Sequence, residues 1–374
     1  MISYHHISEI PATDLNQIID LFSQNFTGEH EQLKNRFLAE FKQFDPLQWI
    51  IARHQDQVVG ALLLRMHKMN YCGVKLSVCG MSYMAIVPDF QRSEVAETFK
   101  KMAIDAGSNA DISLGFARKK MDGYWSPYGF IGITDFGEFS INALNINLFD
   151  SDYSIQIVDA TIADTKTIEK LYYQLDDQLT GNLVRQSKQF EHAIADPNYR
   201  GQVKCFVKDE AICGYMIIKE DRIKEIRIDD TVKHQIAFSL KKYFQQQQYP
   251  IIYFNTFLND PFLKFLSQFS HEQKTRYAFE GGHILRISNI SDFLQKIRPV
   301  LLKRLNQFNL KSLQLKNDHL SISYLDGEIN INLSKNYDLA ILTKLVFGIV
   351  PSDDEKWQML FGHLHCQIPA FDEF

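Results

Sequence analysis

Several patterns that would assign this chain to a class of protein are missing from its sequence. The 374 residues contain no apolar run of about 18 residues, the length of a membrane-spanning helix, and no basic N-terminal stretch followed by an apolar core. The 5 cysteines are scattered without a C-x-x-C pair, and the 12 histidines show no metal-ligand spacing. We therefore expect a cytoplasmic protein with no membrane span and no metal site.

Excess charge of one sign is also missing. The chain has 40 Lys and Arg residues against 45 Asp and Glu residues, a net charge of −5. This balance argues against nucleic acid or an anionic membrane as partner, because both select a basic surface. Apolar residues make up 45% and aromatic residues 13% of the chain, enough for packed cores. The length predicts two or three domains.

The most informative segment spans residues 84–106. Residues 84–87 read as the end of a buried strand, Pro88 stops the strand, and a short polar loop leads into a helix. A loop that enters a helix N-terminus presents free backbone N–H groups and the positive end of the helix dipole, and together these favour a phosphate group. The helix itself is predicted from apolar residues at helical spacing: Val95, Phe99, Met102, Ala103 and Ala106.

The residues of this loop resemble the pyrophosphate-binding loop of GNAT acetyltransferases. That loop runs Val-x-Pro, two residues, and then Gln/Arg-x-x-Gly-x-Gly/Ala; here Ile86, Gln91 and Ala96 take the first, opening and closing positions. Glu94 replaces the central glycine, and its carboxylate would repel a pyrophosphate. The resemblance implies that acetyl-CoA binds at a set of loop residues: Ile86, Val87, Gln91, Arg92, Ser93, Glu94, Val95 and Ala96.

A second segment, residues 124–130, resembles the GNAT motif Phe-Tyr-x-x-Leu-Gly-Phe. Gly129 and Phe130 match its end, whereas Trp125 stands at the tyrosine that often protonates the leaving thiolate of coenzyme A. An indole donates a hydrogen bond but offers no acidic proton. We therefore take Tyr124 as the candidate general acid and Tyr128 as its alternative. A purely structural role in the core is the competing interpretation for all these rings.

The order of elements predicts an α+β fold in three parts. Residues 1–150 follow the GNAT order of helices, a strand meander, helix, strand, helix and strand, with residues 139–148 as the last strand. Residues 151–287 repeat this order at an offset of 141 residues, which predicts a second, degenerate GNAT-like domain. Its loop has Asp229 where the first has proline, so we expect it to bind no coenzyme.

Residues 288–374 read as a helix, three short strands and two further helices. This order resembles the sterol carrier protein-like α/β domain that ends one multidomain GNAT group, typified by the enhanced intracellular survival protein. Lipid binding in this part of the chain is a third interpretation. It needs an apolar tunnel, which a sequence does not reveal.

The resemblance implies an acetyl-CoA-dependent N-acetyltransferase that acts on a small amine or polyamine by direct transfer in a ternary complex. In the similar family the last carboxylate of the chain serves as base, and the matching group here is the α-carboxylate of Phe374. Asp372 and Glu373 add negative charge that suits a cationic amine. Glu94 and Trp125 favour the alternative, a catalytically degenerate GNAT scaffold that binds a ligand or partner. The acceptor and the oligomeric state, a homo-oligomer included, stay open.

Overall fold

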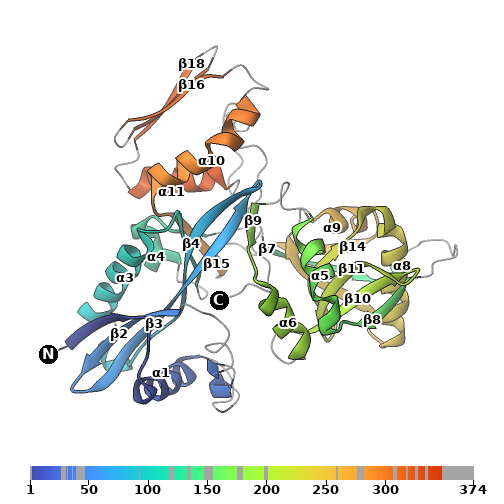
Figure 1. Cartoon of the computed structure of the whole chain (residues 1–374), viewed down its shortest axis with the longest axis horizontal. Coiled ribbons are helices and arrows are strands. Elements are labelled where there is room, and N and C mark those ends of the chain that lie inside the picture. The colour runs from blue at the N-terminus through green and yellow to red at the C-terminus, as the bar shows by residue number, and fades with distance from the viewer. Residues whose placement is uncertain are drawn as a thin grey trace.

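The computed structural model describes most of the chain as three lobes, each built on a β-sheet (Figure 1). The architecture is α+β, as the sequence predicts. The described residues are 2–26, 31, 33–35, 37–38, 47–91, 93–117, 122–132, 136–146, 155–174, 180–197, 201–257, 260–275, 282–305, 310–316, 319–324, 327–332 and 336–347.

The first sheet has eight strands within the described residues, in the order β1-β2-β3-β4-β5-β15-β6, with β9 paired to β3. Its strands are β1 (Ile2–Ile7), β2 (Leu47–His54), β3 (Gln57–Tyr71), β4 (Val74–Ile86), β5 (Ile112–Ala117), β6 (Ile131–Gly132), β9 (Thr180–Leu183) and β15 (Gly282–Ile287). The helices of this lobe are α1 (Ala12–Asn25), α3 (Glu94–Gly107) and α4 (Asp122–Trp125), with short 3-10 turns at Pro88–Phe90 and Ser126–Tyr128. β4 and β5 are parallel, whereas β2, β3 and β4 form an antiparallel meander.

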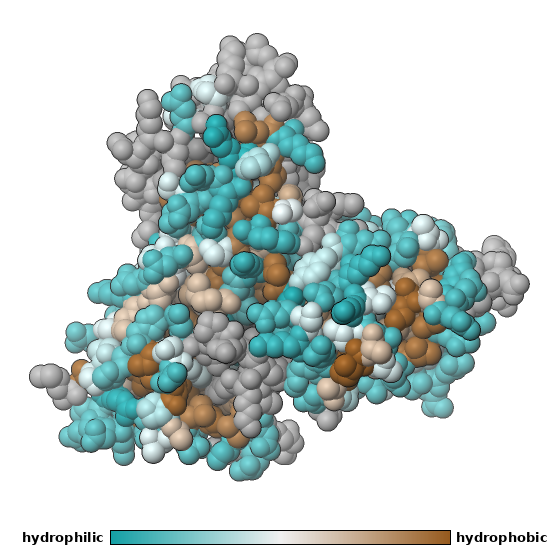
Figure 2. Space-filling model, in the orientation of Figure 1, coloured by the Kyte–Doolittle hydropathy of each residue, from teal (hydrophilic) through white to brown (hydrophobic). Residues whose placement is uncertain are grey.

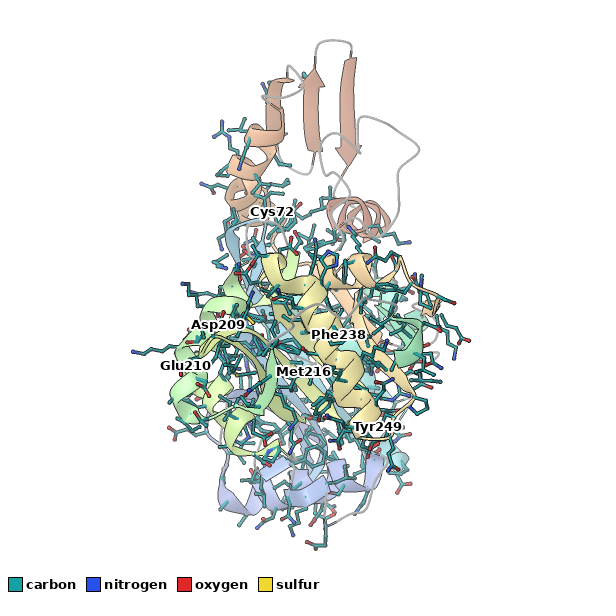
Figure 3. All side chains as sticks on the ribbon, turned by 90° about the vertical axis from the view of Figure 1, so that its right-hand side faces the viewer. Cys72, Asp209, Glu210, Met216, Phe238 and Tyr249 are labelled. Carbon is teal, nitrogen blue, oxygen red and sulfur yellow. The ribbon has the colours of Figure 1, made fainter. Side chains whose placement is uncertain are left out.

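The second sheet has seven strands within the described residues, in the order β14-β7-β13-β12-β11-β10-β8. Its strands are β7 (Phe136–Asn142), β8 (Gln156–Asp159), β10 (Gln202–Lys208), β11 (Ala211–Lys219), β12 (Arg222–Ile228), β13 (Ile251–Phe257) and β14 (His271–Thr275). Its helices are α5 (Thr165–Tyr173), α6 (Ser187–Ala195), α8 (Lys233–Gln246) and α9 (Pro261–Leu266), with 3-10 turns at Ala143–Asn145, Ile162–Asp164 and Asp230–Val232. The hairpin turn at Asp209 and Glu210 lies at the tip of β10 and β11, while Met216 lies inside, beneath the helix that carries Phe238 (Figure 3).

The two sheets have the same plan. In each, a three-stranded meander leads into a parallel pair, β4 with β5 and β12 with β13, and a helix of 14 residues follows the last meander strand. The offset of 141 residues predicts that the counterpart of α3 begins at residue 235, two residues after the observed start of α8. The structural repeat predicted from the 141-residue offset is therefore confirmed.

The sheets also exchange a strand. β7 lies between β13 and β14 of the second sheet, and β15 lies between β5 and β6 of the first. The strand predicted at residues 139–148 thus exists at 136–142, but it completes the other sheet (Figure 1). Because each sheet needs a strand from the other half of the chain, neither closes without its neighbour. The domain boundaries at residues 150 and 287 stay predictions.

The two faces of the first sheet have different covers. On one face α3 packs on a cluster that includes Leu62, Leu64 and Met81. The opposite face, which we call the α1 face, is covered at one end by α1 through Phe22 and at the other by two helices of the third lobe. Residues alternate between these faces along each strand, so the register fixes which side chains share a face.

The third lobe contains α10 (Ile290–Leu305), β16 (Leu310–Lys316), β17 (His319–Tyr324), β18 (Gly327–Asn332) and α11 (Asn336–Val346). Its three strands form an antiparallel sheet in chain order, as predicted. α10 packs on the first sheet through Phe293, and Phe347, directly after α11, packs beside it; both rings contact Tyr71. Cys72, at the tip of the β3–β4 hairpin, lies beside these helices in Figure 3. The relation of this lobe to sterol carrier proteins stays a prediction.

The surface is polar over most of the face shown in Figure 2, where hydrophobic side chains gather only in narrow patches among hydrophilic ones. Within the residues that the structure describes, no helix is both long and apolar enough to cross a membrane.

Candidate functional site

β4 and β5 separate in the middle of the first sheet. They pair as parallel strands up to Met81 and Gly115, and β4 then continues to Ile86 with no partner on β5, although both strands are described throughout. Among the described residues, the backbone groups of this stretch that point away from β3 have no strand partner, so an extended ligand can add there as a strand. We call the point of separation, between Ser82 and Phe116, the vertex.

A β-bulge lies just past the vertex. Tyr83 and Met84 of β4 lie opposite the single residue Leu62 of β3, and Tyr83 has a φ of 52°. Such a bulge bends its strand and increases the twist, which turns β4 away from β5. The Tyr83 ring contacts Phe22 and Phe37 with centroids 5.7 and 5.0 Å apart. This packing holds the bulge, and with it the separation of the strands, in place.

Ser82 places a polar group at the vertex. The residue is 4% exposed, and its Oγ is buried without a hydrogen-bond partner in the structure. A buried hydroxyl in this state costs about 1–3 kcal/mol, and it is available to hydrogen-bond with a group bound at the vertex. It lies opposite Leu63, which faces α1, so Ser82 belongs to the α1 face.

The loop predicted to hold the pyrophosphate is closed by its own hydrogen bonds. Gln91 donates from Nε2 to the carbonyl of Ile86 at 2.9 Å and from its backbone N–H to the carbonyl of Pro88 at 3.1 Å. Ser93 is the N-cap of α3, because its Oγ accepts the N–H of Val95 at 3.2 Å and its carbonyl accepts that of Ala96 at 3.1 Å. The loop is thus pre-formed, and the side chains of Val95 and Ala96 are buried beneath α3.

The first turn of α3 carries two exposed carboxylates. Glu94, the first helical residue, is exposed beside the loop. Glu97 accepts hydrogen bonds from Lys100 at 2.5 Å and from the hydroxyl of Tyr128 at 2.8 Å, and these two partners hold its pKa below the usual value. The charge of Glu97 is therefore balanced locally, whereas Glu94 adds negative charge where the predicted phosphate would lie.

Tyr124 packs against α3. The ammonium of Lys100 lies 4.1 Å from the centre of its ring, a cation–π contact, and Trp125 contacts the same ring edge-on. Burial raises the pKa of Tyr124, and the positive charge of Lys100 lowers it only in part. Tyr124 is thus a protonated phenol at neutral pH and has a proton to give. Trp125 is 8% exposed and part of the core between α3 and the sheet.

Several solved structures resemble this chain over nearly its full length. A protein from Enterococcus faecalis described as a "Probable N-Acyltransferase" matches with a TM-score of 0.70 and 14% identity, over 99% of this chain and 98% of its own. The GCN5-related N-acetyltransferase from Kribbella flavida matches with a TM-score of 0.67 and 10% identity over 100% of both chains. Eis1 from Mycobacterium abscessus matches with a TM-score of 0.61 and 10% identity, over 99% of this chain and 100% of its own.

The chain has the GNAT acyltransferase fold. At identities of 10–14% these structures show the fold alone. No family model and no curated protein matches the chain.

The second GNAT-like sheet has the same separation of strands but a blocked loop. β12 and β13 pair only at Arg222 and Ile223, so the end of β12 is again open on one side. The carboxylate of Asp229, however, accepts the N–H of Thr231 at 2.9 Å and its hydroxyl at 2.7 Å. A negative side chain thus occupies the amide that an anion would need, which supports the prediction that this copy binds no coenzyme.

A buried ion network fills the α5 and α6 side of the second sheet where β12 runs free. Arg185 makes two hydrogen bonds to the carboxylate of Glu225, at 2.8 and 2.6 Å, and the hydroxyl of Tyr215 donates to the same carboxylate at 2.6 Å. Burial acts to raise the pKa of Glu225, but the charges of Arg185 and Arg227 outweigh it and lower that pKa. Side chains thus occupy the region that corresponds to the vertex of the first sheet.

The predicted site residues fall into two groups. One group lies together at the end of β4 and the start of α3: Ile86, Val87, Gln91, Ser93, Glu94, Val95 and Ala96. Tyr124 lies against α3. Arg92 and Phe374 lie outside the described residues. Within the described ranges, no group of three or more His, Cys, Asp or Glu residues is placed to hold a metal ion.

The sequence interpretation missed Ser82. Its only signal is a serine within the apolar run of residues 76–87, which a helix-loop motif does not draw attention to. Lys100 carries a clearer signal, because its spacing of three from Glu97 is the signature of a helical ion pair.

Proposed function

We propose that the chain is an acetyl-CoA-dependent N-acetyltransferase whose first GNAT-like sheet binds the coenzyme. The observation that carries this proposal is the open stretch of β4, which runs from the vertex to the loop and the N-terminus of α3. The pantetheine arm of coenzyme A has two amide groups that can pair with an open strand. The helix N-terminus favours the pyrophosphate.

The dimensions of β4 fit this arrangement. Five residues separate Met81 from Ile86, a length of about 17 Å at roughly 3.4 Å per residue. An extended arm that starts at the loop and follows β4 therefore brings its thioester to the vertex, beside Ser82. The side chains of Val95 and Ala96 are buried, and Ser93 accepts both of their backbone N–H groups, so a pyrophosphate has to displace the Ser93 hydroxyl to bind the N–H of Val95. Glu94 opposes the phosphate charge and is expected to weaken binding.

The chemistry follows from this placement. The acceptor nitrogen, as a neutral amine, attacks the acetyl carbon; the new C–N bond forms as the C–S bond breaks, the nitrogen loses one proton and the sulfur gains one. The hydroxyl of Ser82 donates to the carbonyl oxygen as negative charge develops there. The phenol of Tyr124 is the proposed proton donor to the thiolate, and the α-carboxylate of Phe374 is the proposed base. The proposed acceptor is a small amine or polyamine.

A degenerate scaffold that binds coenzyme A or another ligand without turnover is the second candidate function. The exposed carboxylate of Glu94 at the loop and the buried indole of Trp125 favour it. The two functions differ in one observable, since the scaffold binds coenzyme A but releases no thiol in the presence of acetyl-CoA and an amine.

The test combines calorimetry with an assay for released thiol. We expect the full chain to bind coenzyme A and to release thiol from acetyl-CoA only when an amine is added. Deleting Phe374 should lower kcat at least tenfold and leave coenzyme affinity within about twofold, because the carboxylate moves by roughly 3.5 Å. Binding without amine-dependent thiol release would support the scaffold, and absence of binding would contradict both functions.

A further inference from the structure

Phe116 is exposed where a strand in the middle of a sheet is normally covered. β5 lies between β4 and β15, yet the Phe116 side chain is 44% exposed. Its neighbours on the same face are buried: Leu114, two residues earlier, is 0% exposed, and His283, opposite it on β15, is 5% exposed. The α1 face is therefore uncovered at this one aromatic ring.

The position of the two hydrophobic clusters on this face explains the exposure. Tyr83 and Ala85 belong to the cluster that packs on α1. Val78, Leu114 and Leu285 belong to the cluster that packs on α10 and α11. Along the strands, Phe116 lies between these two clusters and belongs to neither, in the same row as the buried Ser82 and His283.

The register places these three residues in one row across the sheet. Phe116 is the first residue of β5 beyond its pairing with β4, so it lies across the vertex from Ser82. His283 is its direct partner on β15, and their rings meet edge to face at 5.1 Å and 87°. The thioester proposed to lie at the vertex would therefore have the Phe116 ring and the His283 imidazole on its α1 side.

We propose that Phe116 and His283 form the acceptor subsite, and that this subsite takes a primary amine joined to an apolar group, of the arylalkylamine class. This inference rests on the proposed function. The exposed ring provides a flat apolar surface beside the reacting carbon, and an aromatic face also attracts an ammonium group as it arrives. The imidazole accepts a hydrogen bond from the amine nitrogen and orients its lone pair to the acetyl carbon.

The strand exchange gives this subsite an unusual origin. His283 lies on β15, which belongs to the second half of the chain, so the half that lacks its own open site completes the acceptor side of the first. The second GNAT-like half would thus contribute a binding group as well as a strand.

The test compares two amines of different chemistry, 2-phenylethylamine and putrescine, on the full chain saturated with coenzyme A. Calorimetry measures the Kd of each amine, and thiol release from acetyl-CoA measures kcat/KM. Phe116→Ala should weaken 2-phenylethylamine about tenfold, the fold-change for losing contact with roughly half a phenyl side chain, and putrescine less than threefold. His283→Gln should weaken both amines. Neither substitution should change the affinity for coenzyme A more than twofold.

Leu144→Ala is the matched control, because Leu144 is a large hydrophobic residue 63% exposed in the second lobe. It should leave all constants unchanged. Equal losses for both amines with Phe116→Ala, or no loss, would overturn the subsite. A chain that binds coenzyme A but neither amine would overturn it too, while leaving the coenzyme site standing. If coenzyme A itself does not bind, the proposed function fails, and calorimetry with the amines alone still decides the subsite.

Discussion

Replacing Ser82 by alanine separates a catalytic role from a structural one. The hydroxyl is buried without a partner, so its removal breaks no hydrogen bond within the protein and relieves a desolvation cost of about 1–3 kcal/mol. We therefore expect the free energy of unfolding of Ser82→Ala to stay the same or to rise by up to about 2 kcal/mol. If the hydroxyl donates to the acetyl oxygen, kcat should fall about 100-fold, the usual loss for one such donor.

Ser23→Ala provides the matched control. Ser23 is 6% exposed, and its Oγ is also buried without a hydrogen-bond partner, but it lies on α1 and not on the strands that form the vertex. The free energy of unfolding of Ser23→Ala should also stay the same or rise, with a further gain of a few tenths of a kcal/mol from the higher helix propensity of alanine. The kcat of this variant should not change. Urea unfolding and steady-state thiol release measure the two quantities. A Ser82→Ala variant with kcat within twofold of the parent would refute the reasoning, and a loss of stability above about 1 kcal/mol would show that Oγ is bonded in the folded protein.

Three further substitutions test other parts of the site. Glu94→Gln should tighten coenzyme A binding about fivefold in calorimetry, because one exposed like-charge contact costs about 1 kcal/mol; the gain should shrink in 0.5 M salt, and Asp105→Asn at the far end of α3 should show none. Tyr124→Phe should lower kcat about tenfold or more with coenzyme affinity unchanged, and an unaltered kcat would exclude Tyr124 as the acid. Glu225→Gln should lower the free energy of unfolding by about 3–5 kcal/mol at pH 7, since it leaves Arg185 without its buried anion. Because the pKa of Glu225 is lowered in the fold, that stabilisation is complete above the ordinary pKa of 4.5 and is lost as the pH falls below it. Urea unfolding at pH 4 should therefore show a smaller difference in stability between the parent and Glu225→Gln than at pH 7. An equal difference at the two pH values would argue against the ion pair.

Most elements that the sequence predicts are present because their signals are local. The helix expected after the loop spans residues 94–107, and α10 is followed by three short strands, as predicted for residues 288–374. Apolar periodicity and turn residues lie within each such segment, so one stretch of sequence determines it. The exchange of β7 and β15 has no such signal, since alternation along a strand does not state which neighbour the strand will pair with.

The candidate site also contains one part that the sequence predicts and another that only the fold brings together. The loop at Gln91 and Ser93 was found because strand, proline and helix follow one another in the chain. Ser82, Phe116 and His283 come from three strands that the fold brings into one row, and their separation in sequence gives no hint of this. The exposure of Phe116 arises from the gap between two packed clusters, which only the assembled sheet reveals.

Hydrogen exchange of the full chain with and without acetyl-CoA shows which of the two sheets binds the coenzyme. We expect slower exchange in a peptide covering residues 82–96, where the open edge of β4 and the N-terminus of α3 gain hydrogen-bond partners. We expect no change in the peptide covering residues 224–236, the matching segment of the second sheet, where Asp229 already occupies the loop amide. Protection confined to the second segment, or absent from both at saturating coenzyme, would contradict the assignment of the coenzyme site to the first sheet.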